Sequence, residues 1–211
     1  MAGATADSAR IAQMISIHKA KIDDIFITLD SHHRNHIAHA VFWTNDANER
    51  PHPFQMITAD EIERGVWFPI DPSLKDHCKY YSKQLEAKKR FQLTIWPEHC
   101  LIGTPGHAVI ESIHRSLMEW VAIKFRTINY LMKGMNCLTE MYSAIAAEVP
   151  ILSDPETQYN TEFLKELQTA DRLIIGGQAM SHCVQYTVRD IVAAYRKEER
   201  YKIVLLKDGN V

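Results

Sequence analysis

The sequence lacks the features that mark membrane, exported and nucleic-acid-binding proteins. No apolar run among its 211 residues approaches the length needed to cross a bilayer. The first residues, MAGATADSARIAQM, carry no apolar block of the kind found in signal peptides. The formal net charge is only -2, so neither nucleic acid nor an anionic membrane is expected as a partner.

Cysteine is scarce and irregularly spaced. The four cysteines form no CxxC pair and no regular framework, which argues against a disulfide scaffold. Reduced thiols are therefore expected, together with a cytoplasmic location. A composition of 46% hydrophobic and 24% charged residues argues against disorder, and the length fits one domain.

Short apolar stretches alternate with segments of helical periodicity. This alternation predicts an α/β fold, a mostly parallel, doubly wound sheet flanked by helices. We expect a single domain over residues 1–211, with an insertion or lid at about 40–90. The strands are predicted at 25–29, 127–132, 173–175 and 202–206, and the helices at 8–20, 72–89, 107–124, 138–147, 160–169 and 183–195.

Three reactive side chains follow predicted strands. Asp30, Lys133 and Cys183 each lie at or just beyond a strand's carboxyl end, where sites form in parallel sheets. Cys183 falls in the first turn of a predicted helix, a position that favours a thiolate and offers free N–H groups to an oxyanion. Taken alone, a buried structural cysteine is the better interpretation.

A polar loop rich in histidine begins at Asp30. Asp30 and His32 form a DxH pair that could share one ion, and His99 is a plausible third ligand. Imidazole and carboxylate together suit zinc, iron or manganese better than calcium. The alternative is a solvated loop. The remaining histidines of this part of the chain are expected at the surface or behind the ligands: His33, His36, His39 and His52.

Lys133 and Trp96 each have two interpretations. Lys133 is either a surface lysine or a buried ammonium group that would lower the pKa of a neighbouring thiol. Trp96 is either part of the core or a flat apolar wall beside an aromatic substrate.

Four sequence blocks together resemble the isochorismatase-like cysteine hydrolases, and within them the nicotinamidase-related branch. The resemblance runs from about Ser8 to the C-terminus and is specific because the blocks occur in one order. They are LDSHH with HIAHAVFW, IWPEHCLIGTPG, MKGMNCLTEMYSAI, and IIGGQAMSHCVQYTVRDI.

The resemblance implies a parallel sheet flanked by helices and an Asp–Lys–Cys catalytic set. Cys183 matches the nucleophile, Lys133 the lysine, and Ala179 the residue whose amide joins that of Cys183 in the oxyanion hole. A cis, non-proline bond is implied at Gln178–Ala179. The implied metal ligands are Asp30, His32, His99 and Glu140, for zinc or else iron or manganese, and the implied substrate-binding residues are Trp96 and Gln178.

The sequence also departs from the family pattern. No apolar strand ending in DxQ precedes Asp30, so the family's central first strand and its general-base aspartate are expected to be missing. Because the general-base aspartate is expected to be missing, we expect weak or no activity from residues 1–211 alone. The chain also ends at LLKDGNV, before the family's last helix and strand. Nicotinamidases usually have a threonine, an acidic residue and an aromatic residue before the cysteine, and this chain has Met180, Ser181 and His182 there. The sequence therefore does not identify the amide substrate.

Three functional hypotheses remain. The first is a nicotinamidase-like amidohydrolase that converts a small heteroaromatic amide to an acid and ammonia through a cysteine thioester, with metal assistance. The second is an inactive, truncated relative that acts by binding or oligomerisation, since a gap in the sheet could attract a strand from another chain. The third is a hydrolase of a different small substrate. Homo-oligomers are compatible with each.

Overall fold

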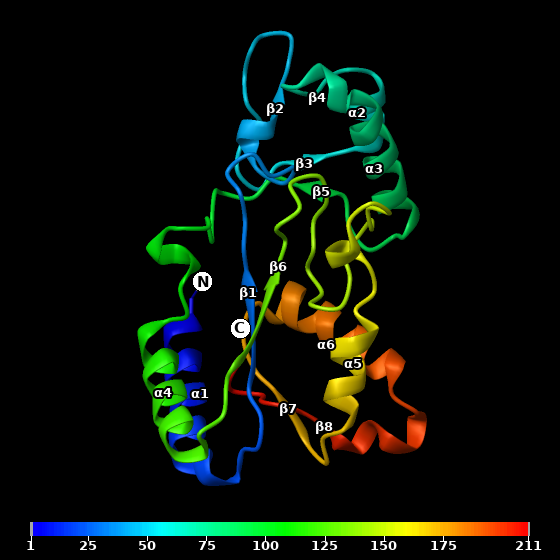
Figure 1. The fold of residues 1–211 in the computed structure, drawn as a ribbon. Coiled ribbons are helices and arrows are strands. Elements are labelled where there is room, and N and C mark those ends of the chain that lie inside the picture. Colours follow the sequence, from blue (N-terminus) through cyan, green and yellow to red (C-terminus); the bar gives the residue numbers. More distant parts are fainter. Residues whose placement is uncertain (1, 211) are drawn as a thin grey trace.

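The computed structural model of the protein describes residues 2–210, which form a mixed α/β fold (Figure 1). Within this range no helix is long and apolar enough to cross a bilayer. The helices are α1 (Ala4–His18), α2 (Ala59–Glu63), α3 (Lys75–Ala87), α4 (Glu111–Lys124), α5 (Thr161–Gln168) and α6 (Gln185–Ala194). The strands are β1 (Phe26–Asp30), β2 (Trp43–Thr44), β3 (Met56–Ile57), β4 (Phe68–Pro69), β5 (Leu93–Thr94), β6 (Asn129–Lys133), β7 (Leu173–Ile175) and β8 (Ile203–Leu205).

Two parallel strand pairs form the centre of the fold. β1 pairs with β6, and β7 pairs with β8. The expected parallel strands are thus confirmed, but they form two separate pairs, and residues 2–210 contain no strand that bridges β1 and β7. This arrangement agrees with the gap expected from the sequence. In the first pair Asp30 lies directly opposite Lys133, so both side chains leave the sheet at the same edge.

Helices cover one face of both strand pairs and, on the other face, β1. On one face, apolar residues of all four strands pack against a cluster formed largely by α5 and α6: Phe26, Leu131, Leu173, Ile175 and Ile203. On the other face, Ile27 packs against a cluster that contains Ile15 of α1 and Trp120 of α4. The two strand pairs are thus joined through the helices α5 and α6, against which residues of both pairs pack.

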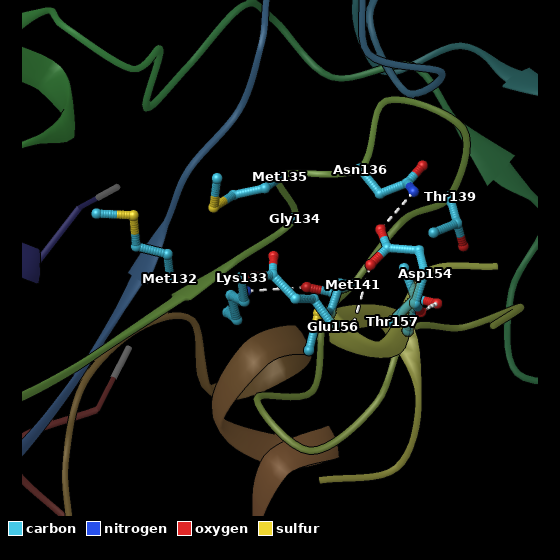
Figure 2. A pocket seen from close by; sticks show the side chains of 11 residues that line it. Met132, Lys133, Gly134, Met135, Asn136, Thr139, Met141, Asp154, Glu156 and Thr157 are labelled. Carbon is cyan, nitrogen blue, oxygen red and sulfur yellow. Dashed lines mark hydrogen bonds between the residues drawn. The ribbon is translucent and has the colours of Figure 1, made fainter. Parts of the chain in front are cut away.

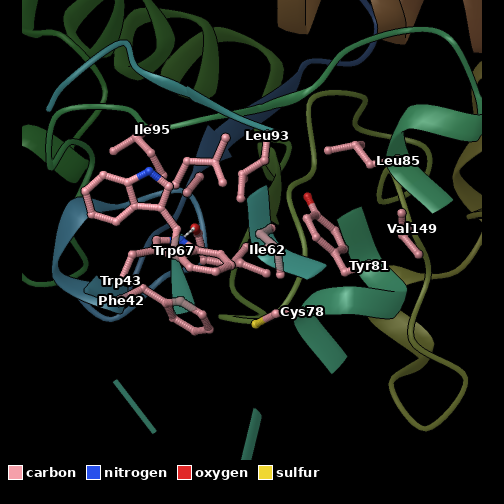
Figure 3. Close-up of a cluster of buried hydrophobic side chains, with 13 residues drawn as sticks. Phe42, Trp43, Ile62, Trp67, Cys78, Tyr81, Leu85, Leu93, Ile95 and Val149 are labelled. Carbon is pink, nitrogen blue, oxygen red and sulfur yellow. Dashed lines mark hydrogen bonds between the residues drawn. The ribbon is translucent and has the colours of Figure 1, made fainter. Parts of the chain in front are cut away.

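Residues 40–90 and the segments on either side of them pack around an apolar cluster that also contains Ile37, Leu93, Ile95 and Val149 (Figure 3). Two short antiparallel pairs, β2–β4 and β3–β5, lie there with α2 and α3 (Figure 1). Helix α2 begins at Thr58 with a capping box, in which the Thr58 hydroxyl accepts the Glu61 amide and the Glu61 carboxylate accepts the Thr58 amide. The side chains of Trp43 and Tyr81 are completely buried in this cluster.

The helix predicted over 138–147 is wrong. Residues 138–147 contain no helix, because side chains take up backbone N–H groups that a helix would use. The Met141 amide donates to Glu140 Oε1 (3.0 Å), and the Ile145 amide donates to Ser143 Oγ (3.1 Å). The Ala144 amide donates to Thr187 Oγ1 of α6 (3.0 Å). The apolar periodicity of this segment reflects burial in an irregular chain rather than a helical face.

Candidate active site

The paired ends of β1 and β6 place a buried charge pair at one edge of the fold. Lys133 is only 4% exposed, and its ammonium group forms an ion pair with Asp30 Oδ1. Its Nζ also donates to the carbonyl oxygen of Met141 (3.0 Å; Figure 2) and to Cys183 Sγ (3.5 Å). Asp30, Lys133 and Cys183 thus meet in one place, as their positions after strands predict.

Cys183 lies in a single π-helical turn, Met180–Val184, that runs directly into α6. The Ala179 carbonyl accepts hydrogen bonds from the amides of His182 and Val184, each at 3.1 Å, and so fixes the turn that carries the thiol. The peptide bond between Gln178 and Ala179 is cis, as the family resemblance implies. The thiol lies 3.5 Å from Lys133 Nζ, at the end of β6.

The charges of this group oppose one another. Burial alone would lower the pKa of Lys133, but Asp30 and Cys183 outweigh it and raise that pKa. Burial likewise opposes the effect of Lys133 on Asp30, yet the ion pair keeps the pKa of Asp30 below its usual value. For Cys183 the balance is reversed: burial raises the pKa of the thiol by more than Lys133 lowers it. Burial therefore outweighs the neighbouring ammonium group, on which the expectation of a thiolate partly rested.

Asp30, His32 and His99 form a group with the geometry of a metal site. One ligand atom from each lies within 4.8 Å of the others. His32 Nδ1 is 3.3 Å from the carbonyl oxygen of Gly134, and His99 Nδ1 is 2.8 Å from that of Pro97. A carbonyl only accepts, so each Nδ1 carries the proton and each Nε2 keeps a free lone pair.

The donor set fits a transition metal. Burial holds the pKa of His32 down to about 4, so its ring is neutral and able to coordinate near neutral pH. Asp30 has two carboxylate oxygens, and the pairing of Oδ1 with Lys133 leaves the other one for an ion. Two imidazoles and a carboxylate suit zinc, iron or manganese.

Glu140 lies close by but outside the ligand group. Its side chain is buried, and Oε1 accepts the amide of Met141 at 3.0 Å. Its negative charge opposes the burial effect on the pKa of His32. Glu140 is not one of the three residues whose ligand atoms lie within 4.8 Å of one another.

Two histidines that the sequence analysis assigned to the surface or to positions behind the ligands are completely buried. His36 and His39 are each 0% exposed, and their rings lie 4.8 Å and 5.6 Å from the ring of His32, measured between centroids. His33 and His52 are exposed. The sequence signal for this burial was the spacing of His32, His36 and His39. These residues belong to a loop that closes over the end of β1, and such a loop turns side chains at this spacing inward.

Trp96 forms part of an aromatic wall. Its Nε1 donates to the hydroxyl of Tyr142 (3.0 Å), and its ring lies edge-on to His182, with centroids 5.3 Å apart. His182 precedes Cys183, so the wall lies near the thiol. Gln178 is directed elsewhere, because its side-chain amide donates to the carbonyl oxygen of Ala4 in α1 (2.9 Å). Sequence reasoning did not identify Tyr142 or His182 as parts of this wall.

A small pocket opens beside Lys133 (Figure 2). One of its sides is the loop that carries Asp154, whose Oδ2 accepts a hydrogen bond from Asn136 (2.7 Å). The pocket is lined by Met132, Lys133, Gly134, Met135, Asn136, Thr139, Met141, Ala147, Asp154, Glu156 and Thr157.

No protein-family model matches the chain, and no curated protein sequence does. Solved structures do. A nicotinamidase/pyrazinamidase from Acinetobacter baumanii aligns with 97% of this chain and 73% of its own, at 20% identity and a TM-score of 0.57. The yeast nicotinamidase aligns with 87% of this chain and 68% of its own, at 20% identity and a TM-score of 0.52. The yeast enzyme bound to the inhibitor nicotinaldehyde gives a TM-score of 0.50, at 19% identity, over 85% of this chain and 66% of its own. The chain therefore has the isochorismatase-like, nicotinamidase-related fold.

Proposed function

We propose that the protein is a nicotinamidase-like amidohydrolase that uses Cys183 as its nucleophile. The observation that carries this proposal is the distance of 3.5 Å between Cys183 Sγ and the buried ammonium group of Lys133. A thiol beside a buried cation at the end of a parallel strand has few structural reasons to be there, because an apolar pair would cost less to bury. The shared fold supports the same reaction class.

The reaction requires four events at this site. The Cys183 thiol gives its proton to solvent, which returns one to the amide nitrogen, and the sulfur adds to the amide carbonyl, with the amides of Ala179 and Cys183 holding the oxyanion. The carbon–nitrogen bond then breaks and ammonia leaves with an added proton. Water hydrolyses the thioester to release the acid and the free thiol. Lys133 stabilises the negative sulfur in the first step and again when the thioester breaks.

Burial opposes the first event, the loss of the thiol proton. Because burial keeps the pKa of Cys183 above its ordinary value, little thiolate is present near neutral pH. The carboxylates whose charges act on the thiol, Asp30 and Glu140, raise its pKa further. We therefore expect slow turnover at pH 7 and faster turnover in alkaline solution.

The aromatic wall and the metal group suggest the substrate. The indole of Trp96 and the rings of Tyr142 and His182 offer flat surfaces to a planar heteroaromatic amide such as nicotinamide. Asp30, His32 and His99 would hold a divalent metal, which would supply a Lewis acid for a ring nitrogen. Carbamoyl compounds remain the alternative substrates if the protein binds no metal.

Loss of the Cys183 thiol should abolish function. We expect ammonia release from nicotinamide by the wild-type protein and none from Cys183→Ser or from protein alkylated at Cys183. Cys137→Ser is the matched control, because Cys137 is also partly buried but has only a long contact with Asn35 (3.6 Å). Full ammonia release by Cys183→Ser would refute the assignment.

A second measurement does not require turnover. An aldehyde adds reversibly to a reactive thiol, and nicotinaldehyde is an inhibitor of the yeast enzyme. We expect nicotinaldehyde to protect Cys183, but not Cys137, from alkylation. Equal protection of both thiols, or of neither, would contradict a specific site for a pyridine ring beside Cys183.

One observation favours a non-catalytic alternative. Within residues 2–210, β1 pairs only with β6 and β7 only with β8, so each pair has an unpaired edge that a strand from another chain could occupy. A protein that forms stable oligomers, releases no ammonia and shows no aldehyde protection would match this alternative and exclude the hydrolase.

A further inference from the structure

Helix α3 is hydrogen-bonded to the irregular chain that passes the candidate active site. The side chain of Tyr81 in α3 is 0% exposed, and its hydroxyl accepts the amide of Glu140 (3.2 Å). One turn earlier, His77 Nε2 donates to the carbonyl oxygen of Leu138 (2.8 Å). The rings of His77 and Tyr81 stack, with centroids 6.1 Å apart. Two neighbouring side chains of one helix thus hold two points at the start of residues 138–149.

These points lie where residues 138–149 close into a loop. The amide of Glu148 donates to the carbonyl oxygen of Glu140 (2.8 Å), and the Thr139 hydroxyl donates to that of Val149 (2.8 Å). Lys88, which follows α3, donates from its ammonium group to the carbonyl oxygen of Glu148. Both ends of the loop are therefore attached to α3 or to the residue after it.

The loop in turn contacts the catalytic lysine. Met141 directly follows Glu140, and its carbonyl oxygen accepts Lys133 Nζ (3.0 Å; Figure 2), which also donates to Cys183 Sγ (3.5 Å). Because peptide units are rigid, a displaced Glu140 amide would carry the Met141 carbonyl with it. The Lys133 ammonium group would then keep Asp30 and the thiol as partners, and the charged carboxylate would hold it more strongly than the neutral thiol.

The hydroxyl of Tyr81, rather than its ring, makes the connection. The ring lies among apolar side chains (Figure 3), where phenylalanine would fill the same space. A buried hydroxyl costs free energy unless it is hydrogen-bonded, and this one is bonded to the Glu140 amide. Burial raises the pKa of Tyr81 well above its ordinary value, so the hydroxyl stays neutral while the thiol titrates.

We propose that Tyr81 and His77 are positioning residues of the hydrolase, which hold the Met141 carbonyl where it keeps the Lys133 ammonium group beside Cys183. The inference rests on the proposed function and deepens it. It gives α3, a helix within residues 40–90, a role in the reactivity of a thiol that lies on another part of the chain.

The pH dependence of Cys183 alkylation measures this role without turnover. In Tyr81→Phe the buried Glu140 amide loses its acceptor. We expect alkylation near pH 8 to slow about 3- to 10-fold and the profile to move to higher pH, as part of the shift of about 1–3 pKa units that an adjacent opposite charge produces. The charged groups that act on the thiol, Lys133, Asp30 and Glu140, all remain in this variant, so a shift would report their displacement.

Tyr195→Phe is the matched control. Tyr195 is also buried, at 3% exposed, and its hydroxyl donates to the carbonyl oxygen of Leu167 in α5 (2.7 Å), away from residues 138–149. Each substitution removes one buried hydrogen bond and should lower stability, but Tyr195→Phe should leave the alkylation profile unchanged. If Tyr81→Phe also kept the wild-type profile, its hydroxyl would be merely structural and the inference would be overturned.

His77→Phe tests the same connection from the neighbouring hydrogen bond. It removes the donor to Leu138 and keeps an aromatic ring beside Tyr81, so its profile should move in the same direction. If Tyr81→Phe does not fold, this variant decides, and a wild-type profile would overturn the inference. A wild-type protein that releases no ammonia would contradict the proposed function, whereas the alkylation profiles would still test the positioning role. Ammonia release with unshifted profiles in Tyr81→Phe and His77→Phe would overturn the positioning role alone.

Discussion

Lys133→Met is expected to lower the free energy of unfolding by about 3–5 kcal/mol, because it leaves the Asp30 carboxylate buried without its cation. The same substitution removes the ammonium group from the Cys183 thiol. An adjacent opposite charge shifts a pKa by about 1–3 units, so amide hydrolysis near neutral pH should fall about 10- to 1,000-fold. Urea unfolding and ammonia release measure the two effects separately.

Two further variants isolate the charge pair. Lys83→Met removes a cation from Glu63 on the surface, where the pair is exposed on both sides, and should cost less than about 1 kcal/mol. The double variant Asp30→Asn/Lys133→Met should recover part of the stability lost in Lys133→Met, because no unpaired carboxylate remains. Equal destabilisation by Lys83→Met and Lys133→Met would contradict the buried pair.

Gly134→Ala is expected to damage both the fold and the metal group. Gly134 has φ of 78°, a left-handed conformation that costs other residues about 1–2 kcal/mol. A Cβ atom there would lie 2.7 Å from His32 Cε1 and 3.0 Å from His32 Nδ1, so the imidazole would have to move. We expect a loss of about 2–4 kcal/mol in stability, from strain and displaced packing together, and at least about tenfold weaker zinc binding.

Gly65→Ala provides the matched comparison for Gly134→Ala. Gly65 has φ of 75°, but a Cβ atom there would meet no atom within 4 Å. This substitution should therefore show only the backbone cost, about 1–2 kcal/mol, with unchanged zinc affinity. If the two alanine variants lost equal stability and bound zinc equally, His32 would not be held against Gly134 as described.

The sequence predicted best those features that depend on local pattern. The strand 173–175 is found where its apolar run lies, and α5 (Thr161–Gln168) lies within the helix predicted over 160–169. The parallel direction of the main strands also followed from their alternation with helices. Each of these features is determined by residues close together in the chain, which is why a single sequence contains enough information.

Features that depend on distant contacts were predicted less well. Burial of His39 arises because residues 34–39 fold under the segment at Trp96, whose amide donates to the carbonyl oxygen of Ala38 (2.7 Å). The irregular path of 138–147 is supported by Thr187 in α6. The direction of Gln178 depends on its contact with α1. Such long-range pairings are not encoded in local periodicity.

The raised pKa of Cys183 also depends on contacts between residues far apart in the chain. The position of Cys183 at a helix start and the nearby ammonium group both favour a thiolate, which the sequence allowed us to predict. The depth of burial of the thiol could not be predicted from the sequence, and burial is the effect that raises its pKa above the ordinary value. In the reaction we propose, the Cys183 thiol would therefore have to lose its proton against the effect of burial before it attacks the amide.

The pH dependence of Cys183 alkylation tests the central claim, that this thiol is held beside the buried ammonium of Lys133. An ordinary thiol has a pKa of about 8.5, and burial raises that of Cys183. In the wild type, the alkylation rate should therefore keep rising above about pH 8.5. In Asp30→Asn/Lys133→Met the thiol should titrate at a higher pH still, because Lys133 lowers the pKa by more than Asp30 raises it. Identical profiles for the two proteins would show that the thiol does not lie beside Lys133 and would contradict the account.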